Sequence, residues 1–209
     1  MDHRLIRQNA RYIISGKLFE IWIPLLLIEL ITLPFSIVIL KIAEAGSDLE
    51  KILTIISSLL LMPLTIGSYE YFLDIVRGND KSIKSLFAYF DRFGTILLAI
   101  VIMGILVTLG SFLFIIPGVI IALMYSQVYY VIVENKNYGA LECLKESRTL
   151  IDGYKWDYLV FNFKFIGWIL LTIFTFGIAG IYVIPYIIIA QAKYYDNLVL
   201  LHKNWLTTN

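Results

Sequence analysis

Six long apolar segments constrain the fold of this chain more than any other feature of its sequence. They cover about residues 18–40, 52–73, 95–114, 118–133, 158–176 and 178–198. A helix needs about 20 mostly apolar residues to cross roughly 30 Å of hydrocarbon. Barrel strands are poor alternatives, because they are only about 9–11 residues long and alternate in polarity. The sequence therefore predicts an all-α, polytopic membrane protein with six transmembrane helices in a single membrane domain, residues 1–209.

The composition agrees with a membrane protein. Hydrophobic residues make up 59% of the 209 residues and charged residues only 16%, whereas a soluble domain is typically about 45–50% apolar and about 25% charged. This balance excludes a soluble enzyme and a nucleic-acid partner. The single cysteine, Cys143, excludes an internal disulfide and a cysteine zinc cage.

Charge is distributed unevenly among the connecting segments. Residues 1–17, 74–94 and 134–157 each hold four Lys or Arg, whereas residues 41–51 hold two, diluted by acidic residues. The positive-inside rule then predicts that both termini are cytoplasmic. The first apolar run is about 23 residues long and no small-residue cleavage site follows it, so we expect an uncleaved span rather than a signal peptide.

The chain also suggests a threefold helical-hairpin repeat. An amphipathic, basic segment precedes each odd-numbered span and predicts three interfacial helices on the cytoplasmic side, next to anionic headgroups. Each is followed by a glycine, and each even-numbered span carries a proline and a tyrosine-rich end. Basic flanks and interfacial tyrosines are, however, common to all membrane helices. The candidate interfacial cations are Arg4, Arg7, Arg11, Lys81, Lys84 and Arg148.

Polar residues inside the apolar runs are the candidate site, because a charge at mid-membrane costs about 2.5–3.5 kcal/mol on the insertion scale. The candidates for a cytoplasm-facing cavity are Glu29, Glu70, Gln127, Asn162, Lys164, Gln191 and Lys193. We expect Lys164 or Lys193 to pair with Glu70, Asp74 or Glu29. Salt bridges that only lock helices, snorkelling side chains and a protonated Glu29 in a helix contact are the alternatives.

Catalytic signatures are missing from the sequence. The two histidines, His3 and His202, lie at opposite ends of the chain, so we expect no histidine-based acid–base or metal constellation. No phosphate-binding glycine loop, metalloprotease helix or nucleophile elbow is present. We therefore expect a non-enzymatic protein without a cofactor or a metal.

Several short motifs in the second half resemble the bacterial membrane proteins of the domain-of-unknown-function 975 family. They are Ile115-Ile116-Pro117-Gly118, Tyr125-Ser126, Ser147-Arg148, Gly153-Tyr154-Lys155-Trp156, Phe165-Ile166-Gly167-Trp168, Pro185-Tyr186 and Tyr194-Tyr195-Asp196-Asn197-Leu198. The resemblance covers about residues 67–198 and is looser in the first half; Asp152 departs from the apolar residue expected there. It implies a multi-pass protein of the bacterial cytoplasmic membrane, without an established activity. The chain is also similar to the membrane portion found beside some glycerophosphodiester phosphodiesterase domains.

Two functional hypotheses follow from these observations. In the first, the protein binds a lipid or a small amphipathic solute in the cytoplasm-facing cavity, as a binding or transport-accessory protein. In the second, it is a structural or regulatory scaffold whose partners are membrane lipids, another membrane protein or a second copy of the chain. A third, minor hypothesis is that the protein protects the cell that makes it against membrane-active peptides.

Overall fold

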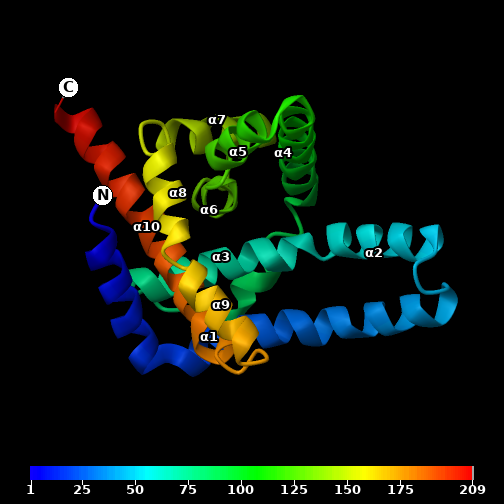
Figure 1. Ribbon diagram of the computed structural model, residues 1–209. Coiled ribbons are helices and arrows are strands. Elements are labelled where there is room, and N and C mark those ends of the chain that lie inside the picture. The colour runs from blue at the N-terminus through cyan, green and yellow to red at the C-terminus, as the bar shows by residue number, and fades with distance from the viewer. Residues whose placement is uncertain (209) are drawn as a thin grey trace.

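The computed structural model describes residues 1–208, and all the regular secondary structure in that range is helical (Figure 1). The elements are α1 (His3–Ile42), α2 (Asp48–Leu60), α3 (Met62–Arg77), the 3-10 helix η1 (Ile83–Phe87), α4 (Phe93–Leu113), α5 (Ile115–Met124), α6 (Val128–Glu134), α7 (Ala140–Leu150), α8 (Lys155–Phe163), α9 (Ile166–Phe174) and α10 (Gly180–Thr208). The predicted all-α class is confirmed for the described residues.

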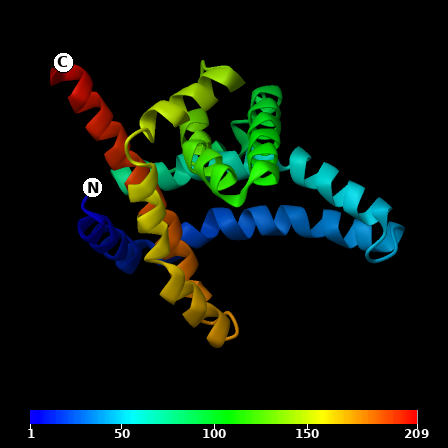
Figure 2. The same cartoon turned by 45° about the horizontal axis from the view of Figure 1, so that its top comes forward.

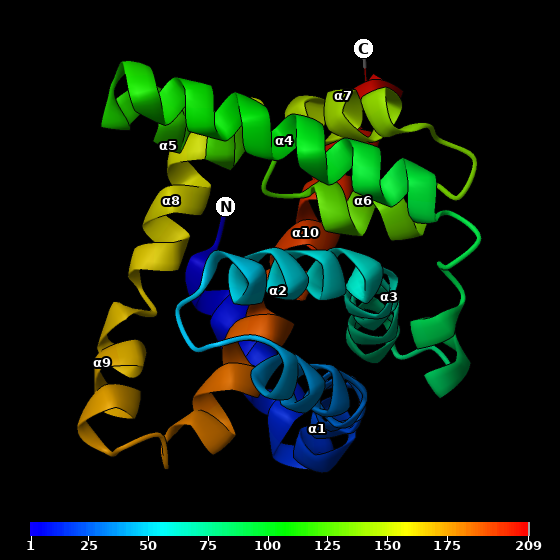
Figure 3. The same ribbon diagram turned by 90° about the vertical axis from the view of Figure 1, so that its right-hand side faces the viewer.

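Three helical hairpins extend from one base, the region where α3, α6 and α10 meet around Tyr69, Tyr130 and Tyr195. The hairpin of α1 and α2 and the hairpin of α9 and α10 point away from the base in different directions (Figures 1 and 2). The hairpin of α4 and α5 extends along a third side (Figure 3). The two joints without charged residues are tight, as predicted. Gly110 and Gly118 allow α4 and α5 to approach closely, because a Cβ on Gly118 would lie 2.8 Å from the Cα of Ser111.

The hydrophobic core lies at the base, where the tyrosine-rich helix ends meet. Tyr130 of α6 stacks on Tyr195 of α10 with a centroid distance of 4.8 Å, and Tyr69 of α3 meets Tyr130 edge-on at the same distance. By contrast, the hairpin ends are exposed, as shown by Leu113 (69%) and Phe176 (99%). The aromatic residues at the base thus join the three hairpins to one another.

By length and composition, fewer helices qualify as membrane spans than the sequence predicts. Among residues 1–208, four helical stretches are long and apolar enough to cross a membrane, or five if α2 and α3, which meet at a 42° bend, form one span. The bend falls at Leu61, where Pro63 lies in the first turn of α3 and lacks an N–H to continue the helix. The sixth predicted segment is α10, whose second half carries Lys193 and Asp196, and it is not among these spans.

The predicted interfacial helices have three different outcomes. The first is the N-terminal arm of α1, which a break at Lys17 separates from the rest of the helix. The second is wrong as an α-helix, because residues 83–87 form a short 3-10 helix against α3. Gly67 permits that contact, since a Cβ there would lie 2.7 Å from the carbonyl oxygen of Leu86. The third is α7, which packs Cys143 and Leu144 into the core.

Candidate functional site

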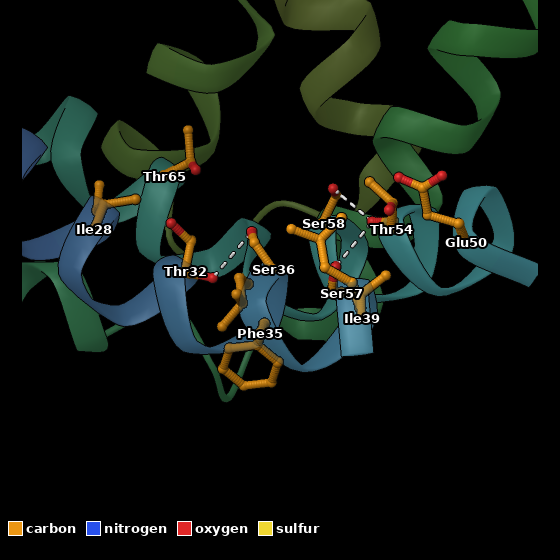
Figure 4. Close-up of a pocket in the computed structure, with 12 residues that line it drawn as sticks. Ile28, Thr32, Phe35, Ser36, Ile39, Glu50, Thr54, Ser57, Ser58 and Thr65 are labelled. Carbon is orange, nitrogen blue, oxygen red and sulfur yellow. Dashed lines mark hydrogen bonds between the residues drawn. The ribbon is translucent and has the colours of Figure 1, made fainter. Parts of the chain in front are cut away.

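A groove between α1 and α2 contains a cavity lined in part by hydroxyl groups. Hydroxyls lie four residues apart on α1, at Thr32 and Ser36, and three and four residues apart on α2, at Thr54, Ser57 and Ser58, and this spacing places them on one face of each helix. The two faces enclose a cavity of about 480 Å³ (Figure 4). Its lining comprises Ile28, Thr32, Phe35, Ser36, Ile39, Leu40, Glu50, Thr54, Ser57, Ser58, Leu61 and Thr65.

Four of these hydroxyls donate their hydrogen to backbone carbonyls of their own helix. Ser57 and Ser58 both donate to the carbonyl oxygen of Thr54, at 2.9 and 2.7 Å. On α1, Ser36 donates to Thr32 at 3.4 Å, and Thr32 donates to Glu29 at 3.1 Å. A hydroxyl has one hydrogen and two acceptor lone pairs. These four side chains therefore offer acceptors, rather than donors, to a molecule in the cavity.

Glu50 forms the loop end of this cavity, at the start of α2. Ser47 caps the helix by accepting from the N–H of Glu50 at 3.1 Å, and the Glu50 carboxylate accepts from the N–H of Gly46. A carboxylate in the first helical turn is stabilised by the helix dipole. No Lys, Arg or His is among the lining residues, so Glu50 is the only charged group of the cavity.

An apolar cavity of about 400 Å³ lies next to the polar one. It is lined by Pro34, Phe35, Val38, Ile39, Leu53, Ile56, Ser57 and Leu60. Phe35, Ile39 and Ser57 belong to both linings, so they form a wall that the two cavities share. A polar and an apolar compartment side by side suit a molecule with a polar head and an apolar chain.

A charged network joins the C-terminal ends of α3 and α6 to the middle of α10 at the base. Arg77 of α3 contacts Glu134 of α6 through Nη2 at 2.7 Å and Asp196 of α10 through Nε at 2.9 Å. Lys193 also contacts Asp196, at 2.9 Å, and the hydroxyl of Tyr195 donates to Glu134. Cavities of about 420 and 390 Å³ border this network. Because the network's cations already have carboxylate partners, its main effect is to hold the base together.

The buried His3 is part of a second, partly buried cluster, which no pattern in the sequence indicated. Its Nε2 lies 2.9 Å from Asp157 Oδ2, and its Nδ1 lies 2.7 Å from Lys164 Nζ. The hydroxyl of Tyr194 donates to the same Asp157 oxygen at 2.9 Å. A lysine ammonium can only donate, so this arrangement assigns the imidazole proton to Nε2. The cluster attaches the N-terminal arm of α1 to α8 and α10.

The predicted pairings of the intramembrane charges are wrong. Lys164 contacts His3, Lys193 contacts Asp196, and Glu70 contacts Lys136 at 2.9 Å. Lys193 pairs within its own helix, whereas the partners of Lys164 and Glu70 lie 161 and 66 residues away in the sequence and are brought to them by the packing of the helices. Glu29 is exposed on α1, and its carboxylate has no polar partner among the described residues.

The uncharged candidates lie deeper in the bundle. Gln191 donates to Asn162 at 3.3 Å and lines a cavity of about 150 Å³ between α1, α3, α6 and α10. Gln127 is buried, and its amide donates to Ser126 at 2.9 Å. The structure thus distributes the predicted residues over several places rather than around one cytoplasm-facing cavity.

The interfacial cations are similarly divided. Arg11 lies over the rings of Trp168 and Tyr186, at 5.7 and 5.5 Å, and Lys81 pairs with Glu20. Arg7 donates to the carbonyl oxygen of His3 at 3.4 Å. The remaining three are exposed: Arg4, Lys84 and Arg148. Within residues 1–208, no group of three or more His, Cys, Asp or Glu side chains is arranged to hold a metal ion.

The fold and the groove together define an all-helical protein whose apolar helices are compatible with a membrane. The family model described as a protein of unknown function (DUF975) matches residues 1–123 and 113–202, and the chain belongs to this family. The match confirms the resemblance read from the motifs and extends it over the first half of the chain. No curated protein and no solved structure matches the chain.

Proposed function

We propose that this protein is a non-enzymatic, multi-pass protein of the bacterial cytoplasmic membrane that binds a lipid or a small amphipathic solute. The binding site is the groove between α1 and α2. The observation that carries this proposal is the position of a hydroxyl-lined cavity of about 480 Å³ next to an apolar cavity of about 400 Å³, with three lining residues in common. Ligand sites of this size commonly combine apolar walls with a few polar groups that fix orientation.

The orientation with both termini in the cytoplasm belongs to the same proposal. It is supported by the concentration of Lys and Arg in residues 1–17, 74–94 and 134–157. The six-span arrangement requires α10 to be counted as a span. A threefold repeat is supported by the meeting of Arg77, Glu134 and Asp196, one from each final helix of the three units. Under this orientation, the groove lies in the outer half of the membrane.

Native mass spectrometry of the protein released from nanodiscs of a bacterial lipid extract tests the binding proposal. We expect the wild type to retain a defined lipid adduct. Ser57 lines both compartments, so Ser57→Leu should fill the groove and remove the adduct. The matched control is Thr108→Leu, at an exposed hydroxyl of α4 outside this groove, which should retain it. A wild type without any adduct contradicts the proposal.

A scaffold role is the second candidate function. Its support is the N-terminal arm of α1, which exposes Leu5 (52%) and Tyr12 (82%) beside the exposed Arg4 and Arg11. Apolar and basic side chains on one helical segment suit a membrane interface or a helical partner. Co-purification of a stoichiometric membrane-protein partner that Tyr12→Ala and Arg4→Ala abolish, with no retained lipid, would favour this role.

A further inference from the structure

We propose that the groove between α1 and α2 selects a lipid whose head is uncharged and rich in hydroxyl groups, such as a glycerol or sugar head, and rejects a phosphate head. This inference rests on the proposed function and names the ligand class of the same site. It follows from the direction of the hydrogen bonds along the groove and from its charge.

The first argument is the excess of acceptors. Thr32, Ser36, Ser57 and Ser58 each donate their hydroxyl hydrogen to a backbone carbonyl. Their oxygens keep free lone pairs, and the Glu50 carboxylate is also an acceptor. Of the six hydroxyls in the lining, only those of Thr54 and Thr65 keep their hydrogens available, so the lining matches a ligand that supplies hydrogens better than one that only accepts them. Hydroxyls of a glycerol or sugar head supply them, whereas an ionised phosphate group is mainly an acceptor.

The second argument is the charge of the lining. Phosphate sites in proteins are built from Arg, Lys or backbone N–H groups at a helix N-terminus. None of the cavity's lining residues is Lys, Arg or His. The nearest helix N-terminus is that of α2. Glu50 places a negative charge there, and the Ser47 hydroxyl already accepts the hydrogen bond of the Glu50 N–H. A phosphate would therefore meet a like charge without a compensating cation.

An amine head is disfavoured by the environment of Glu50. Its carboxylate already accepts from the Gly46 N–H and lies in the first turn of α2. Its charge is therefore stabilised without a ligand cation. The remaining polar groups of the lining are neutral hydroxyls. An ammonium group would lose its hydrating water and gain only the Glu50 carboxylate, which already accepts one hydrogen bond. A head with several hydroxyls can instead donate hydrogen bonds to side chains on both helices.

The test is a lipid competition measured by native mass spectrometry. Nanodiscs of dioleoyl phosphatidylcholine carry equal amounts of monoglucosyl dioleoylglycerol, dioleoyl phosphatidic acid and stearylamine. We expect the wild type to retain the glucolipid at least about tenfold over phosphatidic acid, or about 1.4 kcal/mol. Ser36→Ala with Ser57→Ala should reduce this preference several-fold. Thr108→Val, an exposed hydroxyl of α4, should preserve it.

A second variant keeps the inference testable if the double variant does not fold. Glu50→Gln removes the negative charge, so it should increase the share of phosphatidic acid in the retained lipid. Equal retention of all lipids, or preferred retention of phosphatidic acid or stearylamine by the wild type, overturns the headgroup inference but leaves lipid binding intact. Retention of no added lipid overturns the proposed function as well.

Discussion

The packing of Gly67 allows a stability prediction to be worked out from the structure. Gly67 lies in α3 against the backbone of η1. A Cβ at this position would lie 2.7 Å from the carbonyl oxygen of Leu86, and closer still to the Leu86 Cα and the Ser85 oxygen. Backbone atoms cannot rotate away as a side chain can, so Gly67→Ala must displace η1 from α3. Overpacking of this kind typically costs about 1–3 kcal/mol.

The assay is thermal unfolding of the purified protein in mild detergent, followed by circular dichroism. For a chain of about this size, 1–3 kcal/mol corresponds to a loss of about 2–12 °C in Tm. Gly104→Ala is the matched control, because Gly104 also lies within a helix but its Cβ would have no neighbour within 4 Å. That substitution should be neutral or slightly stabilising. If Gly67→Ala unfolds at the same temperature as Gly104→Ala, the packing of η1 is not as described.

Three further predictions concern the base of the molecule. Arg77→Met leaves the partly buried Glu134 without a cation and Asp196 with Lys193 alone, and should destabilise the protein by about 1–3 kcal/mol. Lys155→Met, which removes an exposed pair, should cost under about 0.5 kcal/mol in the same unfolding assay. Burial raises the pKa of the Cys143 thiol, so its thiolate fraction at neutral pH is small. Maleimide should therefore label Cys143 slowly until dodecyl sulfate unfolds the protein. Equally fast labelling in the folded and unfolded states would contradict the burial of Cys143. His3→Phe removes the hydrogen bonds that attach the N-terminal arm, so limited proteolysis should cleave the arm faster than in Arg4→Gln, and equal rates would refute an attaching role.

The helices and hairpin joints were predictable because they depend on local sequence. A run of about 20 apolar residues favours a helix that can lie within lipid, and Pro117 with Gly118 ends one hairpin arm within a few residues. The break at Lys17 follows Gly16, as expected. Residues 83–87 have the apolar spacing of an α-helix but form a 3-10 helix. This segment packs its backbone against Gly67 of α3, a contact that the spacing of its own residues does not predict.

The charge partners were not predictable, because they depend on how the hairpins pack. Arg77 and Asp196 are separated by 119 residues, and His3 and Asp157 by 154. Nothing in the local pattern selects these pairs over others of equal chemistry. The groove, however, left a signal in the sequence. The four-residue spacing of Thr32 and Ser36 in one apolar run, followed by Thr54 and Ser58 in the next, indicates two facing hydroxyl surfaces.

The most direct test of the proposed ligand site between α1 and α2 is a photocrosslink inside the groove. Benzoylphenylalanine placed at Phe35, which lines both compartments, is irradiated in native membranes and the bound lipid is identified by mass spectrometry. The same probe at Phe112, which is 92% exposed on α4, samples the bulk lipid. We predict one enriched lipid class at Phe35 and the bulk mixture at Phe112. The same mixture at both positions would contradict a ligand site between α1 and α2.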